Sequence, residues 1–251
     1  MDNHKLIGKI IGGGNVENNE SYPFMATFWY LDGMHFKYKA GAIWIGKNYF
    51  LTAAHCILKR DIRMIIIKMG DKNLDKQTLE FRVTTIIMHP NFNSGTLEND
   101  IAILETDNSP TSIFPHLIPV ILPNLSYNIQ YKPNNCLKIL GYGRDKALVN
   151  SFERKHLTEL KEVTVNIIPI NKTGYKKLGT NVFLAGNVIN GVIIDSCIGD
   201  SGGPCIKLIN DRWVLIGIIS CGIGCGDIKY PGIYTKVQPY YTWIYKYCKL
   251  L

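Results

Sequence analysis

A serine surrounded by glycines is the segment of this sequence whose residue types point most directly to chemistry. It reads Gly-Asp-Ser-Gly-Gly-Pro over positions 199–204, with Ser201 as its third residue. A serine hydroxyl becomes an effective nucleophile when a base removes its proton and hydrogen-bond donors receive the developing oxyanion. Glycines let the backbone turn tightly and leave N–H groups free to face a bound carbonyl. We therefore interpret Ser201 as a candidate nucleophile; a glycine-rich turn without chemistry is the alternative.

A histidine and an aspartate in two other segments are candidates for the base that such a serine needs and for an acid that supports this base. His55 follows an apolar run in Leu-Thr-Ala-Ala-His-Cys, and Asp100 opens another in Asn-Asp-Ile-Ala-Ile-Leu. Alone, each has an ordinary structural interpretation, because a histidine can pack in a core and an acid at a strand edge can be paired or solvated. Together the three stand in the order His, Asp, Ser. That order is typical of chymotrypsin-like proteases and differs from those of subtilisin-like and α/β-hydrolase enzymes.

The elements that must position these residues are predicted to be strands. Short apolar runs separated by turn residues recur along the chain, whereas helical periodicity is weak. The runs cover 24–30, 42–45, 64–67, 81–88, 101–104, 137–140, 163–168 and 213–219. This spacing predicts an all-β sandwich or barrel. The tail from Tyr240 is the best helix candidate, because Trp243, Ile244 and Tyr247 follow helical spacing.

These segments give the chain a resemblance to the trypsin/chymotrypsin family, from Ile10 to about Ile244. The resemblance extends to His-Pro-Asn-Phe-Asn at 89–93 and Pro-Gly-Ile-Tyr-Thr-Lys-Val at 231–237. It implies two six-stranded antiparallel β-barrels with the active site between them and a C-terminal helix. The boundaries implied are an activation peptide (1–9) and a peptidase domain (10–251), the latter divided into a first barrel (10–118), a linker (119–134), a second barrel (135–238) and a helix (239–251).

The resemblance assigns roles to five residues of a serine endopeptidase. Ser201 would attack the scissile carbonyl, and His55 would take its proton and return it to the leaving amine. Asp100 would stay ionised and fix the imidazole. The backbone N–H groups of Gly199 and Ser201 would form the oxyanion hole, and Ser220 would support Asp100 and line the substrate cleft.

The resemblance also implies cleavage after Arg or Lys. Asp195, six positions before the nucleophile, would lie at the base of the specificity pocket, where a carboxylate is expensive to desolvate without a cationic partner. Gly222 and Gly232 match the pocket walls. A surface loop aspartate is the alternative. The usual Ser-Trp-Gly is here Ser-Cys-Gly, so Cys221 removes an apolar shelf and subsite preferences do not carry over.

An activation junction is implied at the N-terminus, where Lys9 precedes Ile-Ile-Gly-Gly. Cleavage after Lys9 would free the Ile10 ammonium to pair with Asp200 and order the site. The uncut chain is then expected to be nearly inactive, and self-activation would suit the implied preference for Lys. A flexible glycine-rich terminus is the alternative interpretation.

Seven cysteines leave at least one thiol without a partner inside the chain. The resemblance implies a Cys197–Cys225 disulfide, and a shifted Cys136–Cys205 disulfide is geometrically plausible. The other three have no obvious partner: Cys56, Cys221 and Cys248. Missing bridges suit either an incompletely oxidising compartment or a divergent secreted enzyme.

The composition is that of a globular protein, with 46% hydrophobic and 19% charged residues. A net charge of +8 is compatible with anionic glycans, nucleic acid or membrane surfaces, but the basic residues are scattered and we expect a solvated surface. No apolar stretch is long enough to span a membrane. We expect no cofactor and no metal, since two lysines weaken the loop 70–77 as a calcium site.

The expected partners are proteins or peptides with Arg or Lys at the cleavage site, and protein protease inhibitors. We expect a secreted monomer, although no signal peptide precedes it; a virion or an intracellular location in an AT-rich organism is the alternative. A catalytically silent binding protein on the protease fold is the rival function. Binding of an anionic polymer could coexist with proteolysis.

Overall fold

The computed structural model describes residues 13–133, 135–143, 157–189, 192–196, 199–222 and 229–250. The first barrel closes in the order β2-β3-β4-β7-β6-β5, with every neighbouring pair antiparallel. Its strands are β2 (Met25–Asp32), β3 (His35–Gly46), β4 (Tyr49–Thr52), β5 (Ile65–Met69), β6 (Leu79–Met88) and β7 (Ala102–Thr106). Buried and exposed residues alternate at the start of β6, as expected of a strand with one face on a core.

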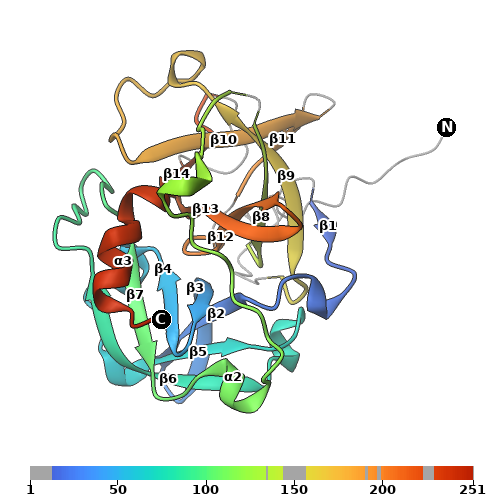
Figure 1. Cartoon of the computed structure of the whole chain (residues 1–251), viewed down its shortest axis with the longest axis vertical. Coiled ribbons are helices and arrows are strands. Elements are labelled where there is room, and N and C mark those ends of the chain that lie inside the picture. Colours follow the sequence, from blue (N-terminus) through green and yellow to red (C-terminus); the bar gives the residue numbers. More distant parts are fainter. Residues whose placement is uncertain are drawn as a thin grey trace.

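The second barrel follows in the chain and closes through the pairing of β9 with β10. Its strands are β8 (Cys136–Gly141), β9 (Lys161–Ile168), β10 (Val182–Ile189), β12 (Pro204–Ile209), β13 (Arg212–Cys221) and β14 (Gly232–Lys236), while β1 (Gly14–Asn15) and β11 (Val192–Ile194) extend the sheet beside β9 and β10. The predicted fold of two six-stranded antiparallel barrels is therefore confirmed. Figure 1 shows the barrels one above the other, with β1 beside β9 of the second barrel.

Two strands are buried on both faces, which marks where the barrels pack together. In β3 the residues from Ala40 to Gly46 are all buried, and in β13 those from Val214 to Ser220 are too. A strand covered on both sides carries a continuous apolar run instead of an alternating one. The inner strands of the two barrels thus border a shared interface, and the candidate site residues lie beside it.

Helices are few and short among the described residues. They are α1 (Ala54–Ile57), α2 (Pro110–Ile113) and α3 (Tyr241–Tyr247), with 3₁₀ turns at η1 (Asn19–Ser21), η2 (Ile62–Met64), η3 (Leu74–Lys76), η4 (Leu125–Tyr127), η6 (Ile170–Lys172) and η7 (Gln238–Tyr240). The predicted C-terminal helix is α3, which lies beside the first barrel (Figure 1), and its Trp243 ring packs on that of His89. None of the described helices is long and apolar enough to cross a membrane.

The predicted Cys136–Cys205 disulfide is wrong: both thiols are free. Strand β12 pairs with β8 so that Cys205 lies opposite Ile139, three residues from Cys136. Because side chains alternate along a strand, an odd offset places the two thiols on opposite faces of the sheet. Cys205 is accordingly buried in the core, whereas Cys136 is exposed. The predicted Cys197–Cys225 disulfide lies outside the described residues.

Candidate active site

Strand pairing in the first barrel brings His55 and Asp100 together. Thr52, at the end of β4, lies opposite Ala102, at the start of β7. His55 follows the first of these residues by three positions, in α1, and Asp100 precedes the second by two. The register of one antiparallel pair therefore places a base and an acid from distant segments at the same end of the barrel.

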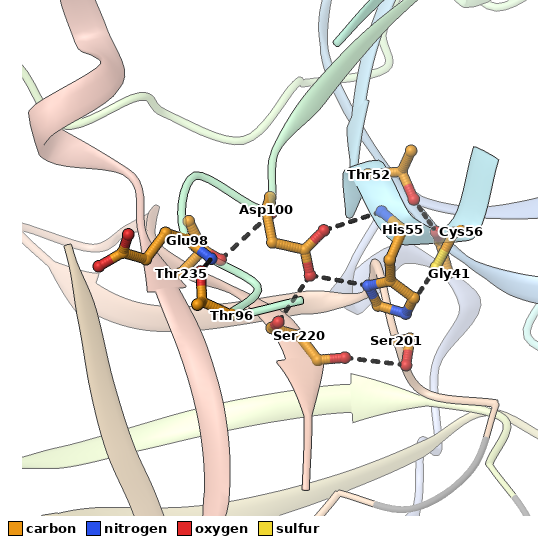
Figure 2. A network of polar contacts seen from close by, with 10 residues as sticks. All are labelled: Gly41, Thr52, His55, Cys56, Thr96, Glu98, Asp100, Ser201, Ser220 and Thr235. Atoms are coloured by element: carbon orange, nitrogen blue, oxygen red, sulfur yellow. Dashed lines mark hydrogen bonds and ion pairs between the residues drawn. The ribbon is translucent and has the colours of Figure 1, made fainter. Parts of the chain in front are cut away.

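The Asp100 carboxylate is fully buried and accepts three hydrogen bonds. Its Oδ2 accepts from His55 Nδ1 at 2.7 Å and from Ser220 Oγ at 2.6 Å, and its Oδ1 accepts from the His55 backbone N–H at 2.8 Å (Figure 2). The Thr235 hydroxyl also donates to the Asp100 backbone carbonyl, at 3.1 Å. A buried charge is tolerable only with such partners. The carboxylate is thus held in one orientation and directs the Nδ1 proton of His55.

The other ring nitrogen of His55 faces sulfur. Its Nε2 lies 3.4 Å from Cys56 Sγ, while the side chain is 28% exposed. Burial of the ring opposes protonation, but hydrogen bonds to Asp100 and Cys56 outweigh that effect, so the pKa of His55 is raised. The imidazole therefore has one nitrogen fixed by an acid and the other open to the cavity.

Ser201 lies beside this imidazole but is held by the second barrel. Its Oγ donates to the Ser220 backbone carbonyl at 3.1 Å, and Figure 2 shows the hydroxyl close to the His55 ring. The Ser201 carbonyl accepts from Gly41 N–H at 2.8 Å, which ties the turn that carries Ser201 to β3. The structure brings His55, Asp100, Ser201 and Ser220 to one place, with the Ser201 hydroxyl bonded to the Ser220 carbonyl and not to His55.

The turn before Ser201 presents two backbone donors. Gly199 has φ +102°, a conformation that favours glycine. The Tyr38 hydroxyl donates to the Gly199 carbonyl at 2.6 Å from a fully buried position. Neither the Gly199 nor the Ser201 backbone N–H donates to another residue that the structure describes. The conformation of this turn is therefore defined by Gly199 and by its contact with Tyr38.

Asp195 is a second buried carboxylate, and it belongs to the second barrel. Its oxygens accept from the backbone N–H of Ser196 at 2.6 Å and of Gly232 at 2.7 Å, with the Tyr234 hydroxyl at 3.3 Å. Burial raises the pKa of Asp195 to about 7, and these hydrogen bonds only partly oppose the shift. A Cβ on Gly232 would lie 2.5 Å from the carboxylate, so this position requires glycine.

A cavity of about 320 Å³ joins these groups. Its lining includes His55 and Ser201, together with Ser196, Ser220 and Gly222. Ser196 is the immediate neighbour of Asp195, so the cavity leads from the imidazole toward the buried carboxylate. His55 of the first barrel and Ser201 of the second thus border one space that a substrate could occupy.

Of the predicted activation pair, Ile10 and Asp200, only Asp200 lies among the described residues. Asp200 is fully buried, and its Oδ1 accepts from Gly143 N–H at 2.7 Å. The carboxylate also fills the space beside Gly141, where a Cβ would meet it at 1.9 Å. Lys9 and Ile10 lie outside the described residues.

Several residues of the site carried no role in the sequence. Tyr234 and Thr235 are adjacent in β14, and both are buried. Two hydroxyl residues side by side in an otherwise apolar strand are only a weak sign of a role in the site. Lys39 and Arg60 also line the cavity. They are two of many scattered basic residues, so no sequence pattern singles them out.

The described residues contain no group of three or more His, Cys, Asp or Glu side chains that could hold a metal ion. In the loop 70–77, the Lys72 ammonium donates to the backbone carbonyls of Val16 and Glu17, at 3.0 and 2.7 Å.

Comparisons with known proteins agree with this geometry. The sequence matches the Trypsin family over residues 10–244. Trypsin Blo t 3 of Blomia tropicalis is 32% identical, over 94% of this chain and 85% of the relative. Ovochymase of Halocynthia roretzi is 33% identical, over 93% of this chain and 15% of the relative.

Vitamin K-dependent protein C of Mus musculus is 29% identical, over 95% of this chain. The chain spans about half the length of the protein C relatives, 47% of the Oryctolagus cuniculus protein and 52% of the mouse protein. The family match covers nearly the whole chain and both barrels. The chain belongs to the trypsin family of serine proteases.

Proposed function

We propose that this protein is an endopeptidase that cleaves after Arg or Lys through an acyl-enzyme on Ser201. The observation that carries the proposal is the pairing of His55 with the buried Asp100, at 2.7 Å, beside a cavity that His55 and Ser201 both line. Membership of a protease family implies protein substrates. To this family membership the proposal adds which residues catalyse the reaction, the preference for Arg or Lys before the cleaved bond, and activation by cleavage after Lys9.

The proposed mechanism begins with a rotation of the Ser201 side chain. Turning about its Cα–Cβ bond moves Oγ from the Ser220 carbonyl toward His55 Nε2, which displaces the contact with Cys56. His55 then removes the hydroxyl proton as Oγ attacks the scissile carbonyl, while Asp100 stabilises the imidazolium. The N–H groups of Gly199 and Ser201 receive the oxyanion. His55 returns the proton to the leaving amine, and water releases the acyl group by the same steps.

Asp195 supports the preference for a basic residue. Its carboxylate is buried, and no Lys, Arg or His of the described chain pairs with it. Because a buried carboxylate without a cation is unfavourable, a substrate guanidinium or ammonium would relieve that cost. Gly222 beside the cavity leaves room for a long side chain.

Activation by cleavage after Lys9 completes the proposal. The new Ile10 ammonium would join Asp200, whose carboxylate already fixes the Gly143 backbone and adjoins Ser201. We expect the Lys9-cleaved protein to hydrolyse an Arg ester and the uncut protein to be nearly inactive. Equal activity of the two forms would contradict this part of the proposal alone.

A fluorophosphonate probe tests the catalytic assignment. The Lys9-cleaved protein should be labelled at Ser201 and should hydrolyse an Arg ester, and Ser201→Ala should lose both. Ser112→Ala, at an exposed serine of α2, is the matched control and should keep both. A correctly folded, cleaved protein that is neither labelled nor active would instead be a silent binding protein.

We also propose that the protein is extracellular. The family match and the relatives named above support secretion, and two sequons provide a test. Asn124 caps η4 and is followed by the exposed Leu125, and Asn171 lies in η6. Expression through a secretory route should add glycan at one or both asparagines, seen as a mass that an endoglycosidase removes.

A further inference from the structure

Two basic side chains line the catalytic cavity without an acidic neighbour in its wall. Lys39, from β3, and Arg60, after α1, both border the space that holds His55 and Ser201. No Asp or Glu belongs to the described lining of this cavity. The opening beside the reacting groups is therefore positively charged.

Arg60 is held in place by contacts that leave its charge unpaired. Its Nε donates to the Cys56 carbonyl at 2.7 Å, and its guanidinium carbon lies 4.7 Å from the centre of the Tyr30 ring. No carboxylate of the described residues lies within ion-pair distance of it. A guanidinium fixed in this way is preorganised to bind a carboxylate with its remaining N–H groups.

Lys39 is only weakly paired. Its ammonium is 4.0 Å from Asp32, and that carboxylate is engaged at 2.9 Å by Lys37. The Lys39 side chain is 30% exposed, half as much as that of Lys37. It therefore adds a second partly buried positive charge that is available to a bound peptide.

The position of His55 shows which side of the substrate these charges face. In the proposed mechanism, His55 Nε2 must reach the leaving nitrogen of the substrate. Cys56 Sγ lies 3.4 Å from this Nε2 atom. Arg60 is bonded to the carbonyl of that same Cys56. Asp195, which would hold the residue before the cut, belongs to the opposite barrel. The cations of the first barrel thus flank the residues that follow the cut.

We infer that Arg60 and Lys39 select substrates with an acidic residue at the first or second position after the cleaved bond. This inference rests on the proposed function and narrows its substrate class to Arg or Lys followed closely by Asp or Glu. The chain's own junction, in which Lys9 is followed by two isoleucines, lacks such an acid. It is therefore a poor substrate for the enzyme itself, and a separate protease performs the activation.

Matched peptides test the inference with the Lys9-cleaved protein. Internally quenched peptides with the sequence of residues 6–15 carry Glu or its isostere Gln at position 10 or 11, and an Arg ester without residues after the bond reports basal catalysis. At low salt, we expect kcat/KM to be about tenfold higher for the better Glu peptide than for its Gln counterpart. This ratio should shrink as salt rises, because the charges are only partly buried.

Substitutions of Arg60 and Lys39 test whether these two residues cause the preference for Glu over Gln. The Glu/Gln ratio of each variant is compared with that of the unmodified protein, so a change in overall rate does not obscure it. Arg60→Gln should lower the ratio to near one, and Lys39→Gln should reduce it in part. Arg63→Gln is the control: its charge is 85% exposed, is paired with Asp61 and does not line the cavity, so the ratio should persist.

The outcomes separate this inference from the proposed function. Ester hydrolysis with a Glu/Gln ratio near one at both positions would overturn the inference and leave the proposed function standing. A ratio that survives Arg60→Gln combined with Lys39→Gln would also overturn it. If the cleaved protein hydrolysed neither the ester nor any peptide, the proposed function would fail and the inference with it.

Discussion

Asp100 and Asp195 are both buried carboxylates, yet they have different surroundings. Asp100, in the first barrel, accepts from His55 twice and from Ser220 across the barrel interface. Asp195, in the second barrel, accepts mainly from neutral backbone groups, and no described cation pairs with it. Its pKa is raised to about 7 by burial, so its charge is not fully stabilised in the free protein.

Under the proposed function, this contrast separates catalysis from substrate selection. The Asp100 carboxylate has a permanent partner that can become cationic, so it would stabilise the charge that forms on His55 in each turnover. The Asp195 carboxylate would gain a cationic partner only when a substrate binds. Four predictions test this contrast, from the largest expected effect to the smallest.

Breaking the first arrangement should have the largest effect. Asp100→Asn replaces an acceptor that fixes the Nδ1 proton of His55, so the imidazole loses its productive tautomer. We expect kcat for an Arg ester to fall about 10⁴-fold. Asp75→Asn, at an exposed position of η3, is the control and should leave kcat unchanged. A loss of less than tenfold in Asp100→Asn would show that the pair is structural.

Breaking the second arrangement should affect selectivity and the pH dependence of stability. Asp195→Asn removes the partner of a substrate cation, and kcat/KM for an Arg ester should fall by about 10²–10³-fold. The same change removes the titrating group, so the free energy of unfolding of the variant should fall less between pH 4 and 8 than that of the unmodified protein. Denaturant unfolding across this range measures the difference, and an equal fall in both proteins would contradict the raised pKa of Asp195.

The pH dependence of binding should sharpen the comparison. A cation binds the ionised form of Asp195, whose pKa in the free protein is about 7. Below that pH, the Kd for a small arylamidine should therefore rise about tenfold per pH unit, until the pKa of the bound state is reached. Calorimetry between pH 5 and 8 measures this slope, and Asp195→Asn should abolish it.

The same shift sets the sign of a stability effect. Since the folded pKa of Asp195 lies above its unfolded value, folding favours the protonated acid. Its contribution to stability is complete at low pH and is lost as the pH rises from about 4 through 7.

The smallest expected effect concerns the open side of the imidazole. The Cys56 contact helps to raise the pKa of His55, and only the neutral imidazole can accept the Ser201 proton. Cys56→Ala should lower this pKa and move the acid limb of the kcat/KM profile to lower pH by about half a unit to one unit. An unchanged or upward-moved limb would show that the sulfur does not support the protonated ring.

Much of the fold was predictable because both barrels repeat short apolar runs with turn residues between them. The predicted β-barrels and the C-terminal helix are confirmed. The order of His55, Asp100 and Ser201 also singled out three residues that lie together in the structure, where Asp100 bonds to His55 and Ser220 and Ser201 bonds to Ser220. Their roles stay predictions until the variants are measured.

Contacts that depend on exact register were not predictable. The sequence predicts a disulfide between Cys136 and Cys205, yet the pairing of Cys205 with Ile139 places the two thiols on opposite faces of the sheet. The bond from the Ser201 hydroxyl to the Ser220 carbonyl, in place of His55, likewise depends on a rotamer that sequence does not encode. Lys39 and Arg60 gather only because β3 and the turn after α1 meet at the cavity.

At one point of the barrel interface the two backbones meet at glycines, where a Cβ on Gly41 would lie 2.6 Å from the Gly203 backbone. The turn that carries Ser201 rests directly on a strand of the other barrel, with Thr52 and Gly41 crowding Gly202 in the same way. A protein cut in the linker into two fragments would consequently have no partial activity to share between them. Function would return only on reassembly, so complementation of the fragments would report how tightly the halves associate.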